Sequence, residues 1–591
     1  MPDLPVLHDC DVLIVGSGAA GMAAAVTAAD LGLDVIVAEK APLLGGTTAI
    51  SGGWLWIPHS PEARAAGFSE PREAPVRYLR ALLGARYDDT LIQAFLDAGP
   101  QMLAFFERHT QVHFQPGLTT PDFHGEIDQA ATGGRSLVAE PYDGRQLGPL
   151  LAQLAPPLAE TTLMGMAIAP GPDLRAFLTA FRSAASMLHV LRRLGRHLID
   201  LLGHGRAMQL VNGNALTARL LRSAADRNVP LLTQTCVEAL ESDGRRVTGA
   251  RVRTAGGVGL IRARRAVVLA CGGFPHDRQR QSLLLPHVAE GFAHHSAAPA
   301  SNTGDGLRLA EALGALVDTG QVDPVAWAPV SLVPGKNGQP TRFPHLVERG
   351  KPGLIAVTRA GRRFVNEGGS YHGYMRALFA ATPAGQEPAS WLICDRRFLR
   401  RYGLGAVKPF PVPIGRWLRN GYLLQGRSLR ELAEACGIDP DGLAATIAAW
   451  NAQARSGSDP AFGRGTTPYH RAQGDPDHRP NPCIAPIEAG PFYAVRIVPG
   501  SLGTFAGLKT DAHARVLDRE GAPIAGLYAA GNDMNSIMGG HYPGGGITLG
   551  PAMTFGWIAA RHIAAQTQAQ TQAQSQAQSE EAHANPPHVP A

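Results

Sequence analysis

Residues 11–39 read DVLIVGSGAAGMAAAVTAADLGLDVIVAE, and this stretch decides the fold. The run DVLIV (11–15) is continuously apolar, as expected of a parallel strand that is buried on both faces. A helix of small residues follows and closes at Gly32, and a second apolar run (33–38) predicts the next strand. The stretch therefore forms one complete strand–helix–strand unit of an α/β fold.

The turn between the first strand and the helix carries three spaced glycines. Gly16 permits a tight turn, Gly18 lets the backbone approach a pyrophosphate, and Gly21 lets helix and strand pack closely. The N–H groups at the start of the helix favour phosphate oxygens. Glu39 ends the second strand, where a carboxylate suits a ribose with a free 2′-hydroxyl. This arrangement predicts a dinucleotide site.

A second glycine-rich stretch, LGGTTAISGG (44–53), follows soon after the acidic residue. A simple NAD domain has no use for it, whereas FAD continues past the pyrophosphate to a ribityl chain and a flavin. Small residues would let the backbone approach the isoalloxazine closely. Later strand-and-glycine turns, AVVLACGGF (266–274) and LYAAGN (527–532), repeat the pattern. We therefore predict FAD, bound non-covalently.

The predicted cofactor residues are spread over these stretches. No metal site or disulfide framework is expected, because the six cysteines are scattered and none forms a CxxC pair.

In chain order, the predicted cofactor residues are Gly16, Ser17, Gly18, Ala19, Ala20, Gly21, Glu39, Lys40, Gly45, Gly46, Thr47, Thr48, Ser51, Gly52, Gly53, Val237, Ala270, Gly272, Gly531, Asn532, Ile547 and Leu549.

The chain has 591 residues, more than one hydrophobic core usually serves, which favours two domains. Its net charge of +5 is small for this length and does not suggest a nucleic-acid partner. We predict α/β architecture: a Rossmann-like FAD-binding domain from residues 8–286 and 498–565, and an inserted α+β substrate domain at 287–497. Residues 566–591 are a Gln/Ala-rich tract with little to bury, and we predict a disordered tail.

An insertion at about 150–206 carries leucines and phenylalanines at helical spacing between residues 174 and 202, with arginines among them. Such a stripe is most often a helix face packed on the body of the protein. The alternative is an interfacial helix that lies on a membrane, with its arginines at the headgroups. The sequence leaves both alternatives open.

The N-terminus runs into a strand without a basic start or a cleavage site, so no signal peptide is expected. No stretch of about 18 uncharged apolar residues predicts a transmembrane helix. We expect a cytoplasmic protein, with membrane association through residues 174–202 as the alternative above. The sequence identifies neither the electron acceptor nor the oligomeric state.

The glycine-rich stretches and the late block LYAAGNDMNSIMGGHYPGGGITLGPAMTFGWIAA (527–560) resemble the flavoprotein family that contains fumarate reductases, succinate dehydrogenases and 3-ketosteroid dehydrogenases. The resemblance covers nearly the whole chain except the tail and the segment around 150–206. Fumarate reductases hold a dicarboxylate with histidines and arginines. Here GHYPGGG (540–546) contains no arginine, and GTF (503–505) stands where that branch carries histidine, which disfavours a dicarboxylate substrate.

The same stretch resembles the 3-ketosteroid delta-1-dehydrogenase branch, whose Tyr-x-Gly-x-Gly motif serves the substrate ketone. The resemblance implies that the Tyr542 hydroxyl and the Gly546 N–H donate to the carbonyl oxygen, an oxyanion-hole arrangement for an enolate. It also implies that Tyr371, which follows FVNE (364–367), removes the proton alpha to the ketone. A tyrosine pKa of about 10 must then be lowered, or the proton passed on, for Tyr371 to act near neutrality.

That branch has an early tyrosine that assists the base, near a Pro-Asp-Tyr stretch. Phe123 stands at the expected position here, and His124 and Tyr142 are the alternatives for the assisting role. His541 is expected to be structural. The stretch NTGDG (302–306) resembles a family turn that opens a helix near the flavin.

The leading function is oxidation of a hydrophobic cyclic ketone, in particular 1,2-desaturation of a 3-ketosteroid, where the steroid rests on the resemblance alone. The alternatives are a 3-keto-5α-steroid 4-dehydrogenase, an ene reductase that works in the reverse direction, and a flavin-binding redox sensor without dehydrogenase activity. The presence of Tyr371, Tyr542 and Gly546 argues against the sensor.

Overall fold

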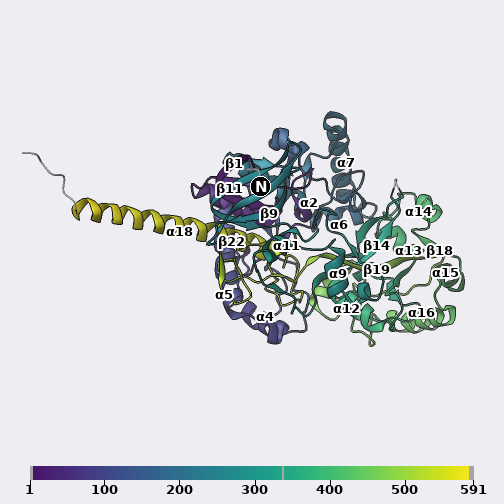
Figure 1. The fold of residues 1–591 in the computed structure, drawn as a ribbon. Coiled ribbons are helices and arrows are strands. Elements are labelled where there is room, and N and C mark those ends of the chain that lie inside the picture. The colour runs from purple at the N-terminus through teal and green to yellow at the C-terminus, as the bar shows by residue number, and fades with distance from the viewer. Residues whose placement is uncertain (1–3, 336–337, 585–591) are drawn as a thin grey trace, which may run out of the picture.

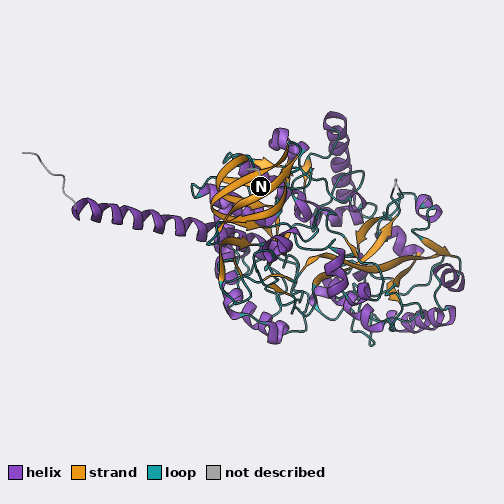
Figure 2. Ribbon diagram, viewed as in Figure 1, coloured by secondary structure: helices purple, strands orange, loops and turns teal. Residues whose placement is uncertain are grey.

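The computed structural model describes residues 4–335 and 338–584. Two mixed bodies of helix and strand lie side by side, each built around one large sheet (Figure 2). The chain begins in the first body, passes through the second and returns to the first. In Figure 1 the yellow C-terminal segment accordingly lies beside the purple N-terminal strands.

The first sheet is built from two distant parts of the chain. Its strands are β1 (Val6–Val15), β2 (Val35–Ala38), β8 (Leu231–Leu232), β9 (Cys236–Ser242), β10 (Val247–Thr254), β11 (Gly257–Leu269), β21 (Arg515–Leu517) and β22 (Pro523–Ala529). The main order is β21-β22-β11-β1-β2-β8, and β10 and then β9 extend the sheet from β11. β1 pairs in parallel with β11 and β2, and residues 12–15 are buried, as their apolar run predicts.

Helices α1 (Ala19–Asp30) and α18 (Leu549–Ala584) pack against each other on this sheet. A Cβ at Gly556 would lie 2.4 Å from the carbonyl oxygen of Ala20, so the missing side chain lets the helices approach closely. A Cβ at Gly531, just beyond β22, would lie 2.9 Å from Ala20 Cβ and 3.9 Å from Ala552 Cβ. The first turns of both helices therefore meet near the carboxyl end of β22.

The predicted disordered tail is helical over most of its length. α18 continues to Ala584 and extends away from the body (Figure 1), whereas residues 585–591 lie outside the described residues. Glutamine and alanine both have good helix propensity, and no proline interrupts the segment before Pro586. A Gln/Ala-rich segment can therefore form a helix even though it has few apolar side chains to bury.

The second sheet has seven strands, which are β12 (His295–Ser296), β14 (Val325–Val333), β15 (Thr341–Pro344), β16 (Leu354–Val357), β17 (Ser390–Asp395), β18 (Leu424–Gly426) and β19 (Phe492–Thr504). β19 lies at its centre, antiparallel to β14 and β17. The predicted boundary at residue 497 falls inside this strand, so β19 leads from one body to the other without a break. Helices α15 (Leu429–Cys436) and α16 (Pro440–Ala454) cover the sheet with a separate apolar core.

The insertion at 150–206 holds two helices where the spacing predicted one. α6 (Pro172–Thr179) and α7 (Ala184–His204) are separated by a break, and Ser183 caps α7 by accepting from the Ser186 N–H. α7 stands out at the edge of the molecule (Figure 1). No helix among residues 4–335 and 338–584 is long and apolar enough to cross a membrane.

The buried residues of α7 are mostly polar, and Val190 is the one apolar residue among the four. Arg193, His197 and Asp200 are buried, and His197 Nε2 lies 2.9 Å from the Met164 carbonyl oxygen. Asp200 pairs with Arg145. The predicted apolar stripe is only partly covered by the protein, because five of its nine residues are half-buried and Phe181, Leu188, Leu191 and Leu198 are exposed. The most deeply buried positions of α7 are therefore mostly occupied by side chains with polar partners, and several of its leucines are exposed.

Candidate active site

The turn after β1 needs two of its three glycines for the fold itself. Gly16 has φ +109°, and a Cβ there would lie 2.2 Å from the Ala270 carbonyl oxygen. A Cβ at Gly21 would lie 2.0 Å from the Gly16 carbonyl oxygen. At Gly18 a Cβ would meet only Thr48 Oγ1, at 3.6 Å. Gly18 therefore keeps space open beside the backbone, which a phosphate group can use.

Ser17 joins this turn to the end of β2. Its N–H and hydroxyl donate to Glu39 Oε2 at 3.0 and 2.6 Å, and its hydroxyl oxygen accepts from the Gly45 N–H at 2.9 Å. Thr48 Oγ1 accepts from the Ala19 N–H at 2.9 Å. The glycine turn, the acidic residue and the second glycine-rich stretch thus form one connected site.

The second glycine-rich stretch contains α2 (Gly46–Ile50) and leads into β3 (Trp54–Trp56). It packs on α8 (Asn212–Ala225): a Cβ at Gly45 would lie 2.6 Å from Thr217 Cγ2, and one at Gly53 would lie 2.4 Å from the Asn212 carbonyl carbon. Ser51 Oγ donates to the Thr48 carbonyl at 2.8 Å. The stretch between Gly45 and Gly53 also contains the predicted cofactor residues Gly46, Thr47, Thr48 and Gly52.

The turn at 302–306 lies beside this stretch, as the resemblance implies. Asn302 Nδ2 donates to Thr47 Oγ1 at 3.1 Å, and Lys40 forms an ion pair with Asp305. The Lys40 ammonium is therefore engaged within the protein. These two contacts hold the 302–306 turn against Thr47 of the second glycine-rich stretch and against Lys40.

The remaining predicted cofactor residues lie near the ends of strands. Ala270 and Gly272 follow β11, and a Cβ at Gly272 would lie 2.5 Å from Asn302 Nδ2. Val237 is buried in β9, just after Thr235, whose N–H donates to the Glu39 carbonyl at 2.9 Å. Gly531 and Asn532 follow β22.

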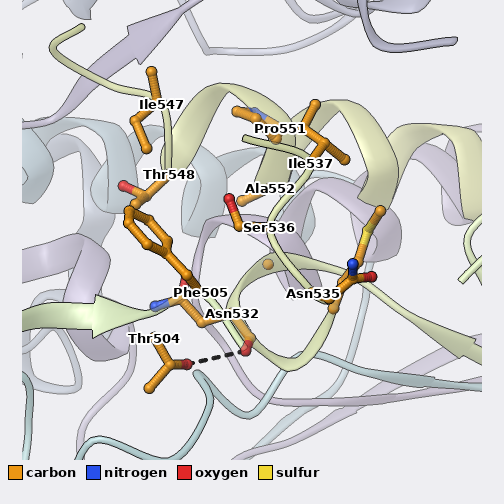
Figure 3. A pocket seen from close by; sticks show the side chains of 12 residues that line it. Thr504, Phe505, Asn532, Asn535, Ser536, Ile537, Ile547, Thr548, Pro551 and Ala552 are labelled. Carbon is orange, nitrogen blue, oxygen red and sulfur yellow. Dashed lines mark hydrogen bonds between the residues drawn. The ribbon is translucent and has the colours of Figure 1, made fainter. Parts of the chain in front are cut away.

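A pocket lies between the end of β19, the loop after β22 and the first turn of α18 (Figure 3). Thr504 Oγ1 donates to the Asn532 carbonyl oxygen at 3.2 Å on one side of it. α18 begins at Leu549, and its first-turn residues Pro551 and Ala552 line the pocket, so the positive end of the helix dipole lies there and favours a partly negative group. The lining comprises Thr504, Phe505, Gly531, Asn532, Met534, Asn535, Ser536, Ile537, Ile547, Thr548, Pro551 and Ala552.

These features fit FAD. Gly18 leaves the backbone open to a pyrophosphate, and Glu39 provides a buried carboxylate for a ribose. The pocket at the start of α18 suits the flavin end, because a helix N-terminus stabilises the negative charge that a flavin gains on reduction. All three features lie beyond the carboxyl ends of β1, β2 and β22, the edge where α/β sheets bind ligands.

An aromatic cluster borders this pocket. The rings of Tyr371 and Tyr542 meet edge to face, with their centroids 4.9 Å apart and their planes at 77°. Phe505, which lines the pocket, has its ring centroid 5.9 Å from that of Tyr542. The fold thus brings the two predicted catalytic tyrosines together beside the predicted flavin site.

Tyr371 is the first residue of α12 (Tyr371–Ala381), and Ser370 Oγ caps this helix by accepting from the Gly373 N–H at 2.9 Å. The Arg349 guanidinium lies nearby and donates only to backbone carbonyls. Burial raises the pKa of Tyr371 well above its ordinary value, the neighbouring Tyr542 raises it further, and Arg349 opposes both effects. The pKa is therefore not lowered, so the phenolate form of Tyr371 needs stabilisation by another group for this residue to act as a base.

Gly546 has φ +103°, and a Cβ there would lie 2.5 Å from the Leu55 carbonyl carbon, so only glycine fits. Its carbonyl accepts from the N–H groups of Trp56 and Gly550, at 3.0 and 2.9 Å. Its own N–H has no hydrogen-bond partner among the residues that the structure describes. This N–H is free to serve as a donor.

Phe123 lies inside the cluster, at the position where the family's assisting tyrosine is expected. Its ring centroid is 5.3 Å from that of Tyr371 and 5.4 Å from that of Tyr542. The neighbouring Asp122 is buried and accepts from Trp56 Nε1 at 2.8 Å. Asp122 also pairs with Arg135, and these bonds fix the segment.

The two alternative assisting residues lie elsewhere. His124 Nδ1 lies 3.2 Å from Glu126 Oε1, and the side chain is partly exposed. Tyr142, in β6 (Tyr142–Asp143), packs under the Arg219 guanidinium, 5.3 Å away, and makes no ring contact with the cluster. His541, predicted to be structural, is partly exposed and its backbone N–H donates to the Met538 carbonyl at 2.9 Å.

Two residues of this site carried no recognised sequence signal. Tyr469, in α17 (Pro468–Gln473), has its ring centroid 4.5 Å from that of Phe123. His372 lies 5.8 Å from Tyr542 by ring centroids, accepts from the Trp327 N–H through Nδ1, and contacts Asp323 through Nε2 at 2.9 Å. The position of His372 directly after Tyr371 could have drawn attention to it. Tyr469 lies in no motif, and only tertiary packing brings it here.

Comparison with known proteins identifies the family of the chain. The model of the FAD binding domain family matches residues 11–549. A 4-oxocyclohex-2-ene-1-carboxylate 5-dehydrogenase of Sinomonas cyclohexanicum is 40% identical over 94% of both chains. A 3-oxosteroid 1-dehydrogenase of Mycobacterium tuberculosis is 36% identical over 95% of this chain and 99% of that protein.

Among solved structures, 3-ketosteroid delta1-dehydrogenase from Sterolibacterium denitrificans, in complex with 1,4-androstadiene-3,17-dione, superposes with a TM-score of 0.87. It is 36% identical to this chain and the match covers 95% of this chain and all of that one. The family match, the relatives and the cofactor geometry agree with one another. The chain therefore belongs to the FAD binding domain family, as an FAD-dependent oxidoreductase related to the 3-oxosteroid 1-dehydrogenases.

Proposed function

We propose that the chain oxidises a hydrophobic cyclic ketone, foremost a 3-ketosteroid, to the conjugated 1,2-unsaturated enone. The observation that carries this proposal is the edge-to-face pair of Tyr371 and Tyr542 beside the pocket at the start of α18. The aromatic surroundings suit an apolar ring. The similarity to 3-oxosteroid 1-dehydrogenases over nearly the whole chain supports the steroid.

The Tyr542 hydroxyl and the Gly546 N–H donate to the ketone oxygen in this mechanism. Burial raises the pKa of Tyr542 to about 12, so the hydroxyl keeps its proton at neutral pH and can donate. Two fixed donors favour the enolate over the ketone, because negative charge develops on the oxygen as the α-proton leaves.

Tyr371 removes the proton from the carbon alpha to the ketone. The positive charge of the nearby Arg349 guanidinium stabilises its phenolate. When bound, FAD supplies the acceptor for the hydride that leaves the neighbouring carbon. Loss of one proton and one hydride from adjacent carbons forms the double bond of the enone.

A second candidate substrate class is a smaller oxocyclohexane- or oxocyclohexenecarboxylate. One relative 40% identical to this chain is named for 4-oxocyclohex-2-ene-1-carboxylate, and another, 37% identical, is named for 4-oxocyclohexanecarboxylate. The reacting ketone and α-carbon are the same in both classes. A carboxylate needs a cation in addition. The cationic or titratable groups around Tyr542 include the buried His372, 5.8 Å away by ring centroids, the partly exposed His541 and the half-exposed Arg376.

An anaerobic titration tests the proposal. The purified holoprotein is mixed with androst-4-ene-3,17-dione or with 4-oxocyclohexanecarboxylate while flavin absorbance near ~450 nm is followed. Bleaching by the steroid, with a 1,4-dien-3-one product, is the expected result. Bleaching by the carboxylate alone would move the substrate to the second class. A protein that holds FAD and is bleached by neither ketone would contradict the proposed function.

We further propose that the chain associates peripherally with membranes through an apolar patch on the α6–α7 segment. The patch consists of Phe181, Leu188, Leu191, Leu198, Ile199 and Leu202, all exposed, with Leu202 at 91%. Arg182, Arg192 and Arg196 on the same segment are also exposed and suit anionic headgroups. Monomeric surfaces rarely carry such a concentration of apolar side chains without a partner.

Flotation with vesicles tests this second proposal. The protein should float with phosphatidylglycerol vesicles and less with phosphatidylcholine vesicles, because of the arginines. The triple variant Leu191→Ser, Ile199→Ser, Leu202→Ser should stay at the bottom. Leu283→Ser, which changes a leucine that is 75% exposed in α9 (Arg278–Leu284), is the matched control and should float. A wild-type protein that never floats contradicts the proposal.

A further inference from the structure

Phe123 occupies the centre of the tyrosine cluster. Its ring contacts those of Tyr371, Tyr542 and Tyr469, with centroid separations of 5.3, 5.4 and 4.5 Å. A phenylalanine cannot donate a hydrogen bond. The position closest to all three tyrosines therefore contributes packing and no polar group.

Tyr469 carries a hydroxyl that the fold does not use. The residue is 2% exposed, and its oxygen makes no hydrogen bond of normal geometry within the described residues. Burial raises the pKa of Tyr469 to about 12, while the Arg349 charge and the Gln473 side chain, one turn further along α17, act in the opposite direction. A buried hydroxyl without a partner is destabilising, so its presence calls for an explanation.

The segments that carry Phe123 and Tyr469 are packed directly on each other. A Cβ at Gly125 would lie 3.1 Å from Thr467 Cβ, the residue that caps α17. Tyr469 therefore cannot move far from Phe123 without disrupting this contact. Its ring therefore stays beside that of Phe123, within the cluster.

Tyr371 lacks a donor for its phenolate form. The groups that act on it from the surrounding elements are Tyr542, Tyr469 and Arg349. In the proposed mechanism Tyr542 donates to the ketone, and the Arg349 N–H groups donate to backbone carbonyls. Of these three groups, only Tyr469 has an unused donor.

We propose that Tyr469 assists Tyr371 by donating its hydroxyl to the Tyr371 phenolate, and so takes the assisting role for which Phe123 lacks the group. This inference rests on the proposed function. The α-proton passes to the Tyr371 oxygen, its bonding electrons form the enolate, and the proton that Tyr469 donates stays on Tyr469. Tyr469 is thus a positioning residue that acts through Tyr371.

Deuterium uptake at the carbon alpha to the ketone tests the step without hydride transfer. The holoprotein is reduced with dithionite, mixed with 5α-androstane-3,17-dione in D₂O, and followed by NMR. The rate should fall by about tenfold or more in Tyr469→Phe, the effect of losing one hydrogen bond to a charged group. The exchange rate of Tyr469→Phe should also begin to rise at a higher pH than that of wild type, because an unassisted phenolate forms less readily.

A reciprocal variant and a control separate assistance from a structural role. The double variant Phe123→Tyr, Tyr469→Phe should recover the rate and the pH profile, because it moves the hydroxyl to the neighbouring ring. Tyr142→Phe removes another buried, unpaired hydroxyl outside the cluster and should change neither. The thermal midpoint of Tyr469→Phe should equal or exceed that of wild type, since an unpaired hydroxyl is lost.

The outcomes are distinct. Exchange by wild type with an unchanged rate and pH profile in Tyr469→Phe overturns this inference and leaves the proposed function intact. A rate that falls equally at every pH and is not recovered by the double variant also overturns it, because that pattern reflects packing. Absence of exchange in wild type contradicts the proposed function itself.

Discussion

The rings of Tyr371 and Tyr542 lie edge to face with their centroids 4.9 Å apart, although one begins α12 and the other lies in the glycine-rich loop before α18. The pair therefore joins the two bodies of the molecule. Neither body alone contains the pair of tyrosines to which the proposed function assigns ketone binding and α-proton removal.

Replacing Tyr542 by phenylalanine should remove one of two donors to the ketone oxygen. The expected loss is about 10²–10³ in the rate of anaerobic flavin reduction, the usual effect of one oxyanion donor. The packing should be preserved, because the stacked contact with Phe123 involves only the ring. The variant should keep its flavin spectrum and its thermal midpoint, and an unchanged rate with every ketone would contradict the assignment.

The rate of flavin reduction should rise with pH well into the alkaline range. Burial raises the pKa of Tyr371 above its ordinary value, and only the phenolate form removes the α-proton. Stopped-flow reduction measured between about pH 6 and pH 10 should show a rising limb without a plateau near neutrality. A rate independent of pH across this range would indicate a base other than Tyr371.

Glu367 should be essential for stability rather than for chemistry. It is fully buried and accepts from Arg363 at 2.7 Å and from the fully buried Arg464 at 3.1 Å. Glu367→Gln should lower the free energy of unfolding by about 3–5 kcal/mol, because a buried arginine loses its counter-charge. Glu387→Gln, at a pair exposed by about 40%, is the control and should cost under about 1 kcal/mol.

The same carboxylate gives a pH dependence of stability. Burial alone would raise the pKa of Glu367, but Arg363 and Arg464 outweigh it, and the pKa is lowered. A carboxyl whose folded pKa lies below its unfolded value of 4.5 contributes its full stability above that pH. The contribution is lost as the pH falls through the folded pKa. Denaturant unfolding at pH 7 and pH 4 should show this loss in wild type and not in Glu367→Gln.

The sequence predicted those features that depend on short spacing. The glycine turn, Glu39 and the strand at 11–15 could be found because each requires a residue type at a fixed offset within one strand–helix–strand unit. The resemblance likewise located Tyr371 and Tyr542. Their roles stay predictions, but the fold places them together.

The features that the sequence did not predict depend on which partners a side chain finds. The leucines of α7 have helical spacing, yet Arg193 and Asp200 are buried in this helix. They are buried because each forms an ion pair, Arg193 with Asp173 and Asp200 with Arg145. Hydrophobic periodicity predicts which residues share one face of a helix, but it does not predict whether that face packs on the protein. Tyr469 was missed for a related reason, since no local pattern connects it with Phe123.

Two alanine substitutions in one turn should separate the needs of the fold from those of the cofactor. Gly16→Ala should fail to fold or lose several kcal/mol, because Gly16 has φ +109° and its Cβ would lie 2.2 Å from a carbonyl oxygen. Gly18→Ala should fold, since only Thr48 Oγ1 lies near, at 3.6 Å. Its Cβ should nevertheless obstruct the pyrophosphate and weaken FAD binding by about tenfold or more.

The measurements are the thermal midpoint of the apoprotein and FAD affinity by fluorescence quenching. Gly32→Ala is the control, because Gly32 also has positive φ, +80°, but has nothing within 4 Å of its Cβ position and lies at the far end of α1. It should cost a little stability and leave FAD affinity unchanged. Should Gly18→Ala bind FAD as tightly as wild type, the pyrophosphate does not cross the turn at Gly18, and the path of the cofactor over the sheet edge would have to be redrawn.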